Sequence, residues 1–383
     1  MKIPFNKPCM SGNELDYISD AIKKGHISGD GFYTKACHEW FEKNYDANCA
    51  LLTHSATAAL EMAALLCEFD EGEEIIMPSY TFVSTANAFC LRGYVPRFVD
   101  VSMDDLNMDV SNVEASINEK TKAIVVVHYA GFSCDMDAIM NLANKYGLIV
   151  IEDAAQAFGT RYKGKLLGTI GHMGCLSFHE TKNINCGEGG VLFINDDDYI
   201  ERAEVIREKG TNRKNFHRGL VDKYTWVDIG SSYLPSDLLA AYLLSQLQNS
   251  ERISKKRKAI FNLYHDLLKA ILTKFGIMYP KKIINEEGNG HIFYLIFDKK
   301  KLRDDFICEM KLFEIGCVFH YSPLHLSEYY TKLTNIETDC PNTEFISDRI
   351  VRLPIWIGVE PHIEFVSKSI INIIERLMKN QNA

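Results

Sequence analysis

The feature that most limits the fold of this chain is an alternation of short apolar runs with helix-forming stretches between residues 50 and 180. The apolar runs are nearly continuous, which is typical of strands buried on both faces. The strands we expect are Glu74–Pro78, Pro96–Asp100, Ala123–His128, Leu148–Ile151 and Met173–Leu176. Helical patterns at 58–66, 83–91 and 136–146 separate several of them. This alternation predicts an α/β fold with a mostly parallel central sheet and helices on both faces.

The C-terminal part of the chain has a different pattern. Helical periodicity is nearly unbroken from Pro235 to Leu272, and we expect a break near Asn249 or Ser250. Strand candidates and helices follow, at 291–297, 317–321, 301–313 and 361–379. A chain of 383 residues is long enough for two domains. We therefore predict a large α/β domain over residues 1–245 and a smaller α+β domain over residues 246–383.

Composition argues against several classes of function. The formal net charge is −9 and no basic block offsets it, which argues against a nucleic-acid partner. The densest basic run, 255–258, lies in a helical pattern, and we interpret it as a solvated face. Eleven cysteines without a CxxC pair predict reduced thiols and no metal site. No signal-peptide core is evident, and no apolar run reaches the ~18 residues that a membrane span needs. We therefore expect a cytoplasmic protein without a membrane partner.

Two polar side chains follow neighbouring predicted strands. Asp153 comes directly after the strand 148–151, and Lys182 follows the strand 173–176, before a Gly-rich loop. A lone lysine at a strand end is usually a solvated surface residue. In open α/β sheets, however, chemistry gathers where strands end, so that an acid and a lysine there can contact opposite parts of one ligand. Pyridoxal 5′-phosphate (PLP) needs such a pair, an amine for its aldehyde and a carboxylate for its ring nitrogen.

Three other patterns allow both a structural and a functional interpretation. Ser55 and Thr57 precede a strong helix former, where they would be N-caps or, with free N–H groups and the helix dipole, a phosphate seat. Phe82 follows a predicted strand and either belongs to the core or stacks on a flat ring. The polar stretch 211–226 is either an ordered substrate loop or a mobile surface loop.

Jointly these residues resemble the DegT/DnrJ/EryC1/StrS family of sugar aminotransferases, PLP enzymes of fold type I. The resemblance extends from Ile3 to the segment 352–354, which is nearly the whole chain. The motifs that carry it are Ser55–Thr57, Pro78–Phe82, Glu152–Gln156, Ser177–Asn183 and Glu188–Gly190. A dehydrating branch of the family has His where Lys182 stands, so the lysine favours transamination. The resemblance also implies a homodimer with the active site at its interface.

The resemblance implies a role for each motif residue. Lys182 would bind PLP covalently and act as general acid and base. Asp153 would pair with the ring nitrogen, Gln156 would hydrogen-bond the ring 3-oxygen, and Phe82 would stack on the ring. The remaining contacts would hold the phosphate group: Ser55, Ala56, Thr57 and Ser177.

A narrower resemblance, carried by segments such as 80–88 and 222–234, concerns the substrates. It implies that L-glutamate donates its amino group to C4 of the dTDP-linked keto sugar dTDP-4-oxo-6-deoxy-D-glucose, for surface polysaccharide synthesis. The galacto product is favoured, while the gluco epimer and C3 amination of a 3-oxo sugar stay open. A PLP-binding regulator without turnover is the alternative from another class. The expected sugar-nucleotide contacts are Arg213, Lys223, His320 and Tyr321.

Overall fold

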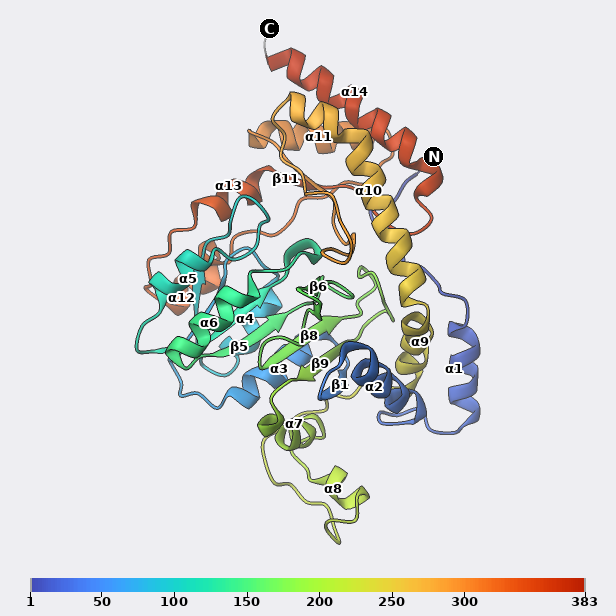
Figure 1. The fold of residues 1–383 in the computed structure, drawn as a ribbon, viewed down its shortest axis with the longest axis vertical. Coiled ribbons are helices and arrows are strands. Elements are labelled where there is room, and N and C mark those ends of the chain that lie inside the picture. Colours follow the sequence, from blue (N-terminus) through green and yellow to red (C-terminus); the bar gives the residue numbers. More distant parts are fainter. Residues whose placement is uncertain (1, 382–383) are drawn as a thin grey trace.

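A computed structural model describes residues 2–381 (Figure 1). Its centre is a seven-stranded sheet in the order β1-β9-β8-β5-β4-β2-β3. The strands are β1 (Cys49–Thr53), β2 (Glu74–Pro78), β3 (Val95–Val99), β4 (Thr121–Val127), β5 (Ile149–Asp153), β8 (Met173–Ser177) and β9 (Gly190–Ile194). Neighbours pair in parallel, except that β9 is antiparallel to both β1 and β8. The predicted mostly parallel sheet is therefore confirmed.

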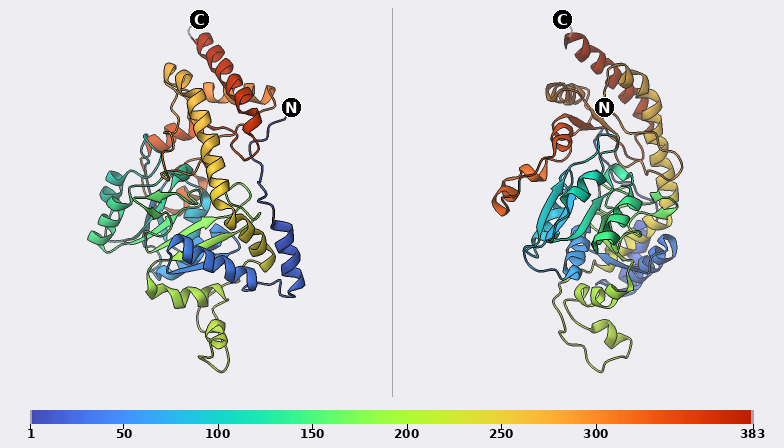
Figure 2. Two further views of the ribbon diagram at one scale, coloured as in Figure 1. Left: turned by 45° about the vertical axis from the view of Figure 1, so that its right-hand side comes forward. Right: turned by 60° about the vertical axis from the view of Figure 1, so that its left-hand side comes forward.

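Helices cover both faces of this sheet (Figure 2). One face packs against α3 (Ala56–Cys67), α4 (Val83–Cys90) and α7 (Ile200–Arg207). The other face packs against α2 (Phe32–Tyr45), α5 (Val110–Ser116), α6 (Met136–Tyr146) and α9 (Asp237–Gln248). Side chains alternate between these cores along each strand: Leu51 faces the first and Leu52 the second. The side chains of neighbouring residues at a strand end therefore point to opposite faces of the sheet.

The C-terminal elements form a further core beyond the sheet. The long helix α10 (Ser250–Lys274) leads from α9 to α11 (Lys300–Leu312) and α14 (Ile363–Gln381) (Figure 1). The strands β10 (Tyr294–Ile296) and β11 (Ile350–Arg352) pair antiparallel beside them. The predicted break is confirmed at Asn249, between α9 and α10. Ile3 also packs into this core and pairs with Ile315. The division at residue 245 stays a prediction.

Some elements differ from the sequence prediction. The segment 317–321 is not a strand, because only Val318 pairs there, with Arg352, before the chain turns toward a cavity. The strand candidate 291–297 shortens to β10. The remaining helices and strands are α1 (Glu14–Lys23), α8 (Arg213–His217), α12 (Glu328–Leu333), α13 (Pro341–Arg349), β6 (Arg161–Tyr162) and β7 (Lys165–Leu166). No helix within residues 2–381 is both long and apolar enough to cross a membrane.

Candidate active site

A cavity of about 890 Å³ lies at the edge of the sheet where β2, β4, β5 and β8 end. Segments of the C-terminal part, including 318–321 and 352–355, line its opposite side. The structure brings all of the predicted PLP contacts to this one cavity: Ser55, Ala56, Thr57, Phe82, Asp153, Gln156, Ser177 and Lys182. They come from separate stretches of sequence, and the sheet topology unites them.

Asp153 ends β5 with its side chain toward α4. Its Oδ2 atom accepts a hydrogen bond of 2.7 Å from the hydroxyl of Thr85, which lies in α4. Its Oδ1 atom accepts one of 3.1 Å from the backbone N–H of Ala155. These two donors fix the orientation of the carboxylate at the edge of the cavity.

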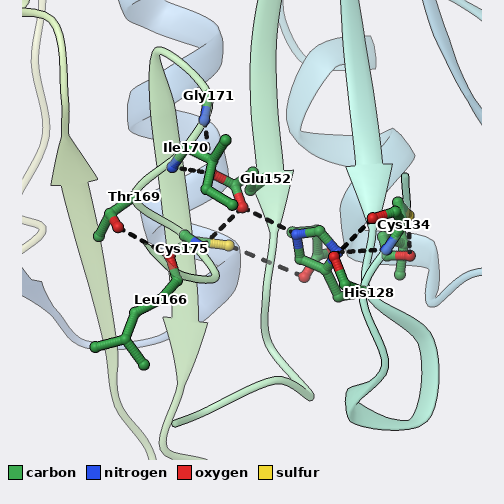
Figure 3. Close-up of polar contacts among 12 residues, drawn as sticks. His128, Cys134, Glu152, Leu166, Thr169, Ile170, Gly171 and Cys175 are labelled. Carbon is green, nitrogen blue, oxygen red and sulfur yellow. Dashed lines mark hydrogen bonds and ion pairs between the residues drawn. The ribbon is translucent and has the colours of Figure 1, made fainter. Parts of the chain in front are cut away.

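Glu152 occupies the opposite face of β5 and is wholly buried. Figure 3 shows its polar contacts. Its carboxylate accepts a hydrogen bond of 2.9 Å from Nε2 of His128. It also accepts three backbone N–H groups, from Gly168, Ile170 and Gly171. The Nδ1 atom of His128 accepts the N–H of Cys134 at 3.2 Å, so the imidazole is neutral with its proton on Nε2. This network fixes the end of β5, and with it the place of Asp153.

Lys182 extends its amine into the same cavity. The pKa of Lys182 is lowered to about 8, chiefly by burial; the nearby charge of Asp153 opposes this shift, and that of Arg352 adds to it. Near neutral pH a useful fraction of the amine is then unprotonated, which is the form that attacks an aldehyde or accepts a proton.

The start of α3 forms another part of the cavity wall. Ser55 is the N-cap of this helix, and its hydroxyl accepts the N–H of Ala58 at 3.1 Å. The next N–H groups, those of Ala56 and Thr57, have no partner within the helix and are available to an anion. A Cβ at Gly190 would lie 2.5 Å from the carbonyl carbon of Ser55, so only glycine lets β9 begin this close to the helix. The N-cap and the phosphate-seat interpretations of Ser55 are thus compatible.

Gln156 links the sheet edge to the C-terminal wall. Its Oε1 accepts the N–H of Ala130 at 2.7 Å, and its Nε2 donates to the hydroxyl of Tyr321 at 3.0 Å. The ring of Tyr321 stacks on His320 with centroids 3.6 Å apart. Both of these predicted substrate residues line the cavity.

The other two predicted substrate residues lie elsewhere in the chain. Arg213 begins α8, which projects away from the sheet (Figures 1 and 2), and it pairs with Glu208 at 3.9 Å. Lys223 is exposed in the loop that follows α8. Neither lines the cavity of its own chain, and their contact with a sugar nucleotide stays a prediction.

The cavity residues without a role predicted from the sequence include Arg257, His291 and Arg352. The interpretation of 255–258 as a solvated face is wrong for Arg257, which is 5% exposed. Helical spacing places it on the inner face of α10 beside Ile253 and Ile260, a signal that the basic run concealed.

Arg352 donates twice to the carbonyl oxygen of Phe319, at 3.3 and 3.2 Å, and lies over the ring of Phe5. No carboxylate among residues 2–381 forms an ion pair with it within 4.0 Å. Arg352 therefore adds a positive charge to the cavity wall.

Comparison with known proteins identifies the family of the chain. The sequence profile described as the DegT/DnrJ/EryC1/StrS aminotransferase family matches residues 8–370. The chain belongs to that family. Over 361 residues it is 33% identical to MJ1066 of Methanocaldococcus jannaschii, an uncharacterized protein, with 92% of each chain covered.

Solved structures of similar proteins share the fold over almost the whole chain. A putative sugar aminotransferase of Streptococcus pneumoniae, Spr1654 in its PMP form, has a TM-score of 0.91 at 23% identity, with 100% of both chains covered. Helicobacter pylori PseC, an aminotransferase involved in the biosynthesis of pseudoaminic acid, has a TM-score of 0.91 at 24% identity, covering 98% of this chain and 100% of that one. A family member from Brucella abortus has a TM-score of 0.84 at 26% identity, with 95% of both chains covered.

As a member of the DegT/DnrJ/EryC1/StrS family, the protein is a PLP-dependent sugar aminotransferase of fold type I. The cavity fits this cofactor chemically, because it combines an amine of lowered pKa, a carboxylate held by two donors and the free N–H groups of a helix start. Within the described chain, no group of three His, Cys, Asp or Glu side chains is arranged to hold a metal ion.

Proposed function

We propose that this family member transfers the amino group of L-glutamate to C4 of dTDP-4-oxo-6-deoxy-D-glucose and favours the galacto product. The observation that supports it most is the meeting of Lys182 and Asp153, which follow different strands, in one cavity with a cationic outer wall. The cavity volume of about 890 Å³ is near the upper end of the range of about 300–1,000 Å³ for small-molecule sites. It therefore suits a nucleotide-linked sugar as well as an amino acid.

The proposed mechanism assigns one proton path to Lys182. Bound PLP supplies the electron sink that makes the α-proton of an amino acid removable. The Nζ atom of Lys182 takes that proton from the donor carbon and later delivers a proton to C4 of the sugar. Asp153, which accepts hydrogen bonds from Thr85 and Ala155, would pair with the ring nitrogen and favour its protonated form. Phe82, at the start of α4, lies beside the cavity where it would cover one face of the ring.

The position of Arg352 favours an anionic amino donor such as L-glutamate. Its guanidinium contacts a carbonyl oxygen and an aromatic ring, so it keeps N–H groups for a ligand carboxylate. Arg352 thus gives the side of the cavity opposite the sheet a positive charge.

The proposal includes a homodimer. The arm formed by residues 211–229 projects from the body (Figure 2) and carries exposed apolar side chains, with Leu220 68% and Trp226 78% exposed. Such a patch is typical of a protein–protein contact. In such a dimer, Arg213 and Lys223, which belong to the same arm, would contact the cavity of the second copy and the phosphates of a nucleotide bound there.

One incubation tests the proposed reaction. The protein is mixed with PLP, L-glutamate and dTDP-4-oxo-6-deoxy-D-glucose, and the product is identified by NMR. An axial amine at C4 is the expected result, and an equatorial amine indicates the gluco variant. If an amino sugar forms only when a dTDP-linked 3-oxo sugar replaces this substrate, the enzyme aminates C3 instead of C4. Absence of any amino sugar would contradict the proposal and favour a regulator without turnover.

A further inference from the structure

We propose that the Nε2 atom of His291 is a fixed hydrogen-bond acceptor that binds a hydroxyl group of the sugar substrate. This inference rests on the proposed function, because it assigns a specificity-determining residue to the sugar half of that reaction. His291 lies between α10 and β10 and lines the cavity that contains Lys182.

Hydrogen bonds determine which nitrogen of His291 carries its proton. The Nδ2 group of Asn183 donates to the carbonyl oxygen of Asn289 at 2.9 Å, which fixes the orientation of the Asn183 amide because a carbonyl can only accept. The Oδ1 atom of Asn183 therefore faces Nδ1 of His291, at 3.1 Å. An amide oxygen also only accepts, so the proton lies on Nδ1. In the neutral ring, Nε2 then presents a lone pair.

The surroundings favour this neutral ring. Burial, and the charges of Lys182, Arg257 and Arg352, lower the pKa of His291 well below its usual value. No carboxylate among the described residues pairs with the ring to oppose them. A second proton on Nε2 would add a cation to a wall that already carries three.

The backbone that carries this imidazole is held on both sides. Arg257 donates to the carbonyl oxygens of Gly290 and His291, at 3.2 and 3.0 Å. Asn289 accepts the N–H of His291 at 3.0 Å and donates to the carbonyl oxygen of Gln156 at 2.8 Å. The acceptor is thus fixed relative to the loop that follows Asp153, so a ligand meets it without reorganisation.

The chemistry of this acceptor selects between the two substrates. A neutral lone pair beside cations suits a hydroxyl, which donates its hydrogen without bringing charge. The carboxylates of an amino-acid donor have no hydrogen to give and are better served by Arg352. Within residues 2–381, no side chain forms a hydrogen bond with Nε2 of His291, because the one side-chain hydrogen bond of the ring is made by Nδ1. Binding of the sugar substrate therefore depends on His291, whereas binding of the amino donor does not.

The test measures the two half-reactions separately in His291→Asn. Asparagine keeps an N–H donor for Oδ1 of Asn183 but removes the acceptor at the Nε2 position. We expect the rate with L-glutamate, followed by cofactor absorbance, to stay within about twofold of wild type. We expect kcat/KM for dTDP-4-oxo-6-deoxy-D-glucose to fall about tenfold, the effect of one lost hydrogen bond. Calorimetric titration of the cofactor-free protein with the same sugar nucleotide should show a similar loss of affinity.

A second variant and two contrary results complete the test. His291→Gln places an amide oxygen near the position of Nε2 and should recover part of the sugar half-reaction, which a packing role would not predict. Unchanged sugar kinetics in His291→Asn, or equal losses in both half-reactions, would overturn the assignment while the proposed function stands. A wild-type protein that reacts with L-glutamate but neither binds nor aminates the sugar nucleotide would overturn the proposed function, and this assignment with it.

Discussion

The hydroxyl of Thr85 donates a 2.7 Å hydrogen bond to Oδ2 of Asp153, a residue 68 positions away in the sequence. The bond joins α4, which begins directly after Phe82, to the end of β5. The Thr85 hydroxyl also contacts that of Thr81 at 2.8 Å, so a chain of hydroxyls supports the carboxylate. This contact therefore links the start of the helix that follows Phe82 to the carboxylate proposed to pair with the ring nitrogen.

Replacing Thr85 with valine tests this support. Valine keeps the shape but leaves Oδ2 of Asp153 without its side-chain donor, so the carboxylate is no longer held in its orientation toward the ring nitrogen. We expect PLP affinity, measured by titrating the cofactor-free protein, to fall about 10- to 100-fold, the value of a hydrogen bond to a charged group. Thr85→Ser retains the donor and should bind PLP almost as wild type does. Equal affinities in Thr85→Val and wild type would contradict this role.

The amine of Lys182 should make cofactor capture depend on pH. Because only the unprotonated amine attacks the aldehyde, the rate at which cofactor-free protein binds PLP covalently should rise with pH, with a midpoint of about 8. Arg352 helps to lower this pKa, so Arg352→Gln should move the midpoint to higher pH. Stopped-flow absorbance measures both curves. A midpoint near the ordinary lysine value in wild type, or no movement in Arg352→Gln, would refute the proposed electrostatics.

Glu152 should matter for stability rather than for contact with a ligand. In Glu152→Gln the carboxylate loses its charge, and an amide NH₂ faces backbone N–H groups that need an acceptor. We expect a loss of about 3 kcal/mol in the free energy of unfolding, because buried N–H groups lose their acceptor. Urea unfolding of the cofactor-free protein measures it, with the exposed Glu119→Gln as control. Similar stability of both variants would show that the network around His128 is dispensable.

The arm of residues 211–229 should control assembly. We expect the wild-type protein to have twice its chain mass of 43.6 kDa in light scattering. Leu220→Ser combined with Trp226→Ser removes the most exposed apolar side chains of the arm and should shift the protein toward monomer. Phe313→Ser, which is 41% exposed outside the arm, is the control. A monomeric wild type, or a dimer unaffected by both changes, would count against this interface.

The sequence predicted the sheet and its edge because parallel strands buried on both faces have a simple apolar pattern. Asp153 and Lys182 could be paired from that pattern, since both follow such strands. The proposed role of His291 could not be recognised, because it depends on Asn183, which meets His291 only after α10 has returned the chain to the sheet. The wrong strand prediction at 317–321 has a related cause. An apolar run next to a cavity has the composition of a strand but lacks the backbone pairing with a neighbouring strand.

The covalent attachment of PLP to Lys182 tests the central claim most directly. The protein is incubated with PLP, reduced with borohydride and digested, and the peptides are analysed by mass spectrometry. A pyridoxyl group on Lys182 in wild type, absent in Lys182→Ala together with the visible absorbance and turnover, is the predicted result. Modification of another lysine under these conditions, or normal turnover in Lys182→Ala, would contradict the account.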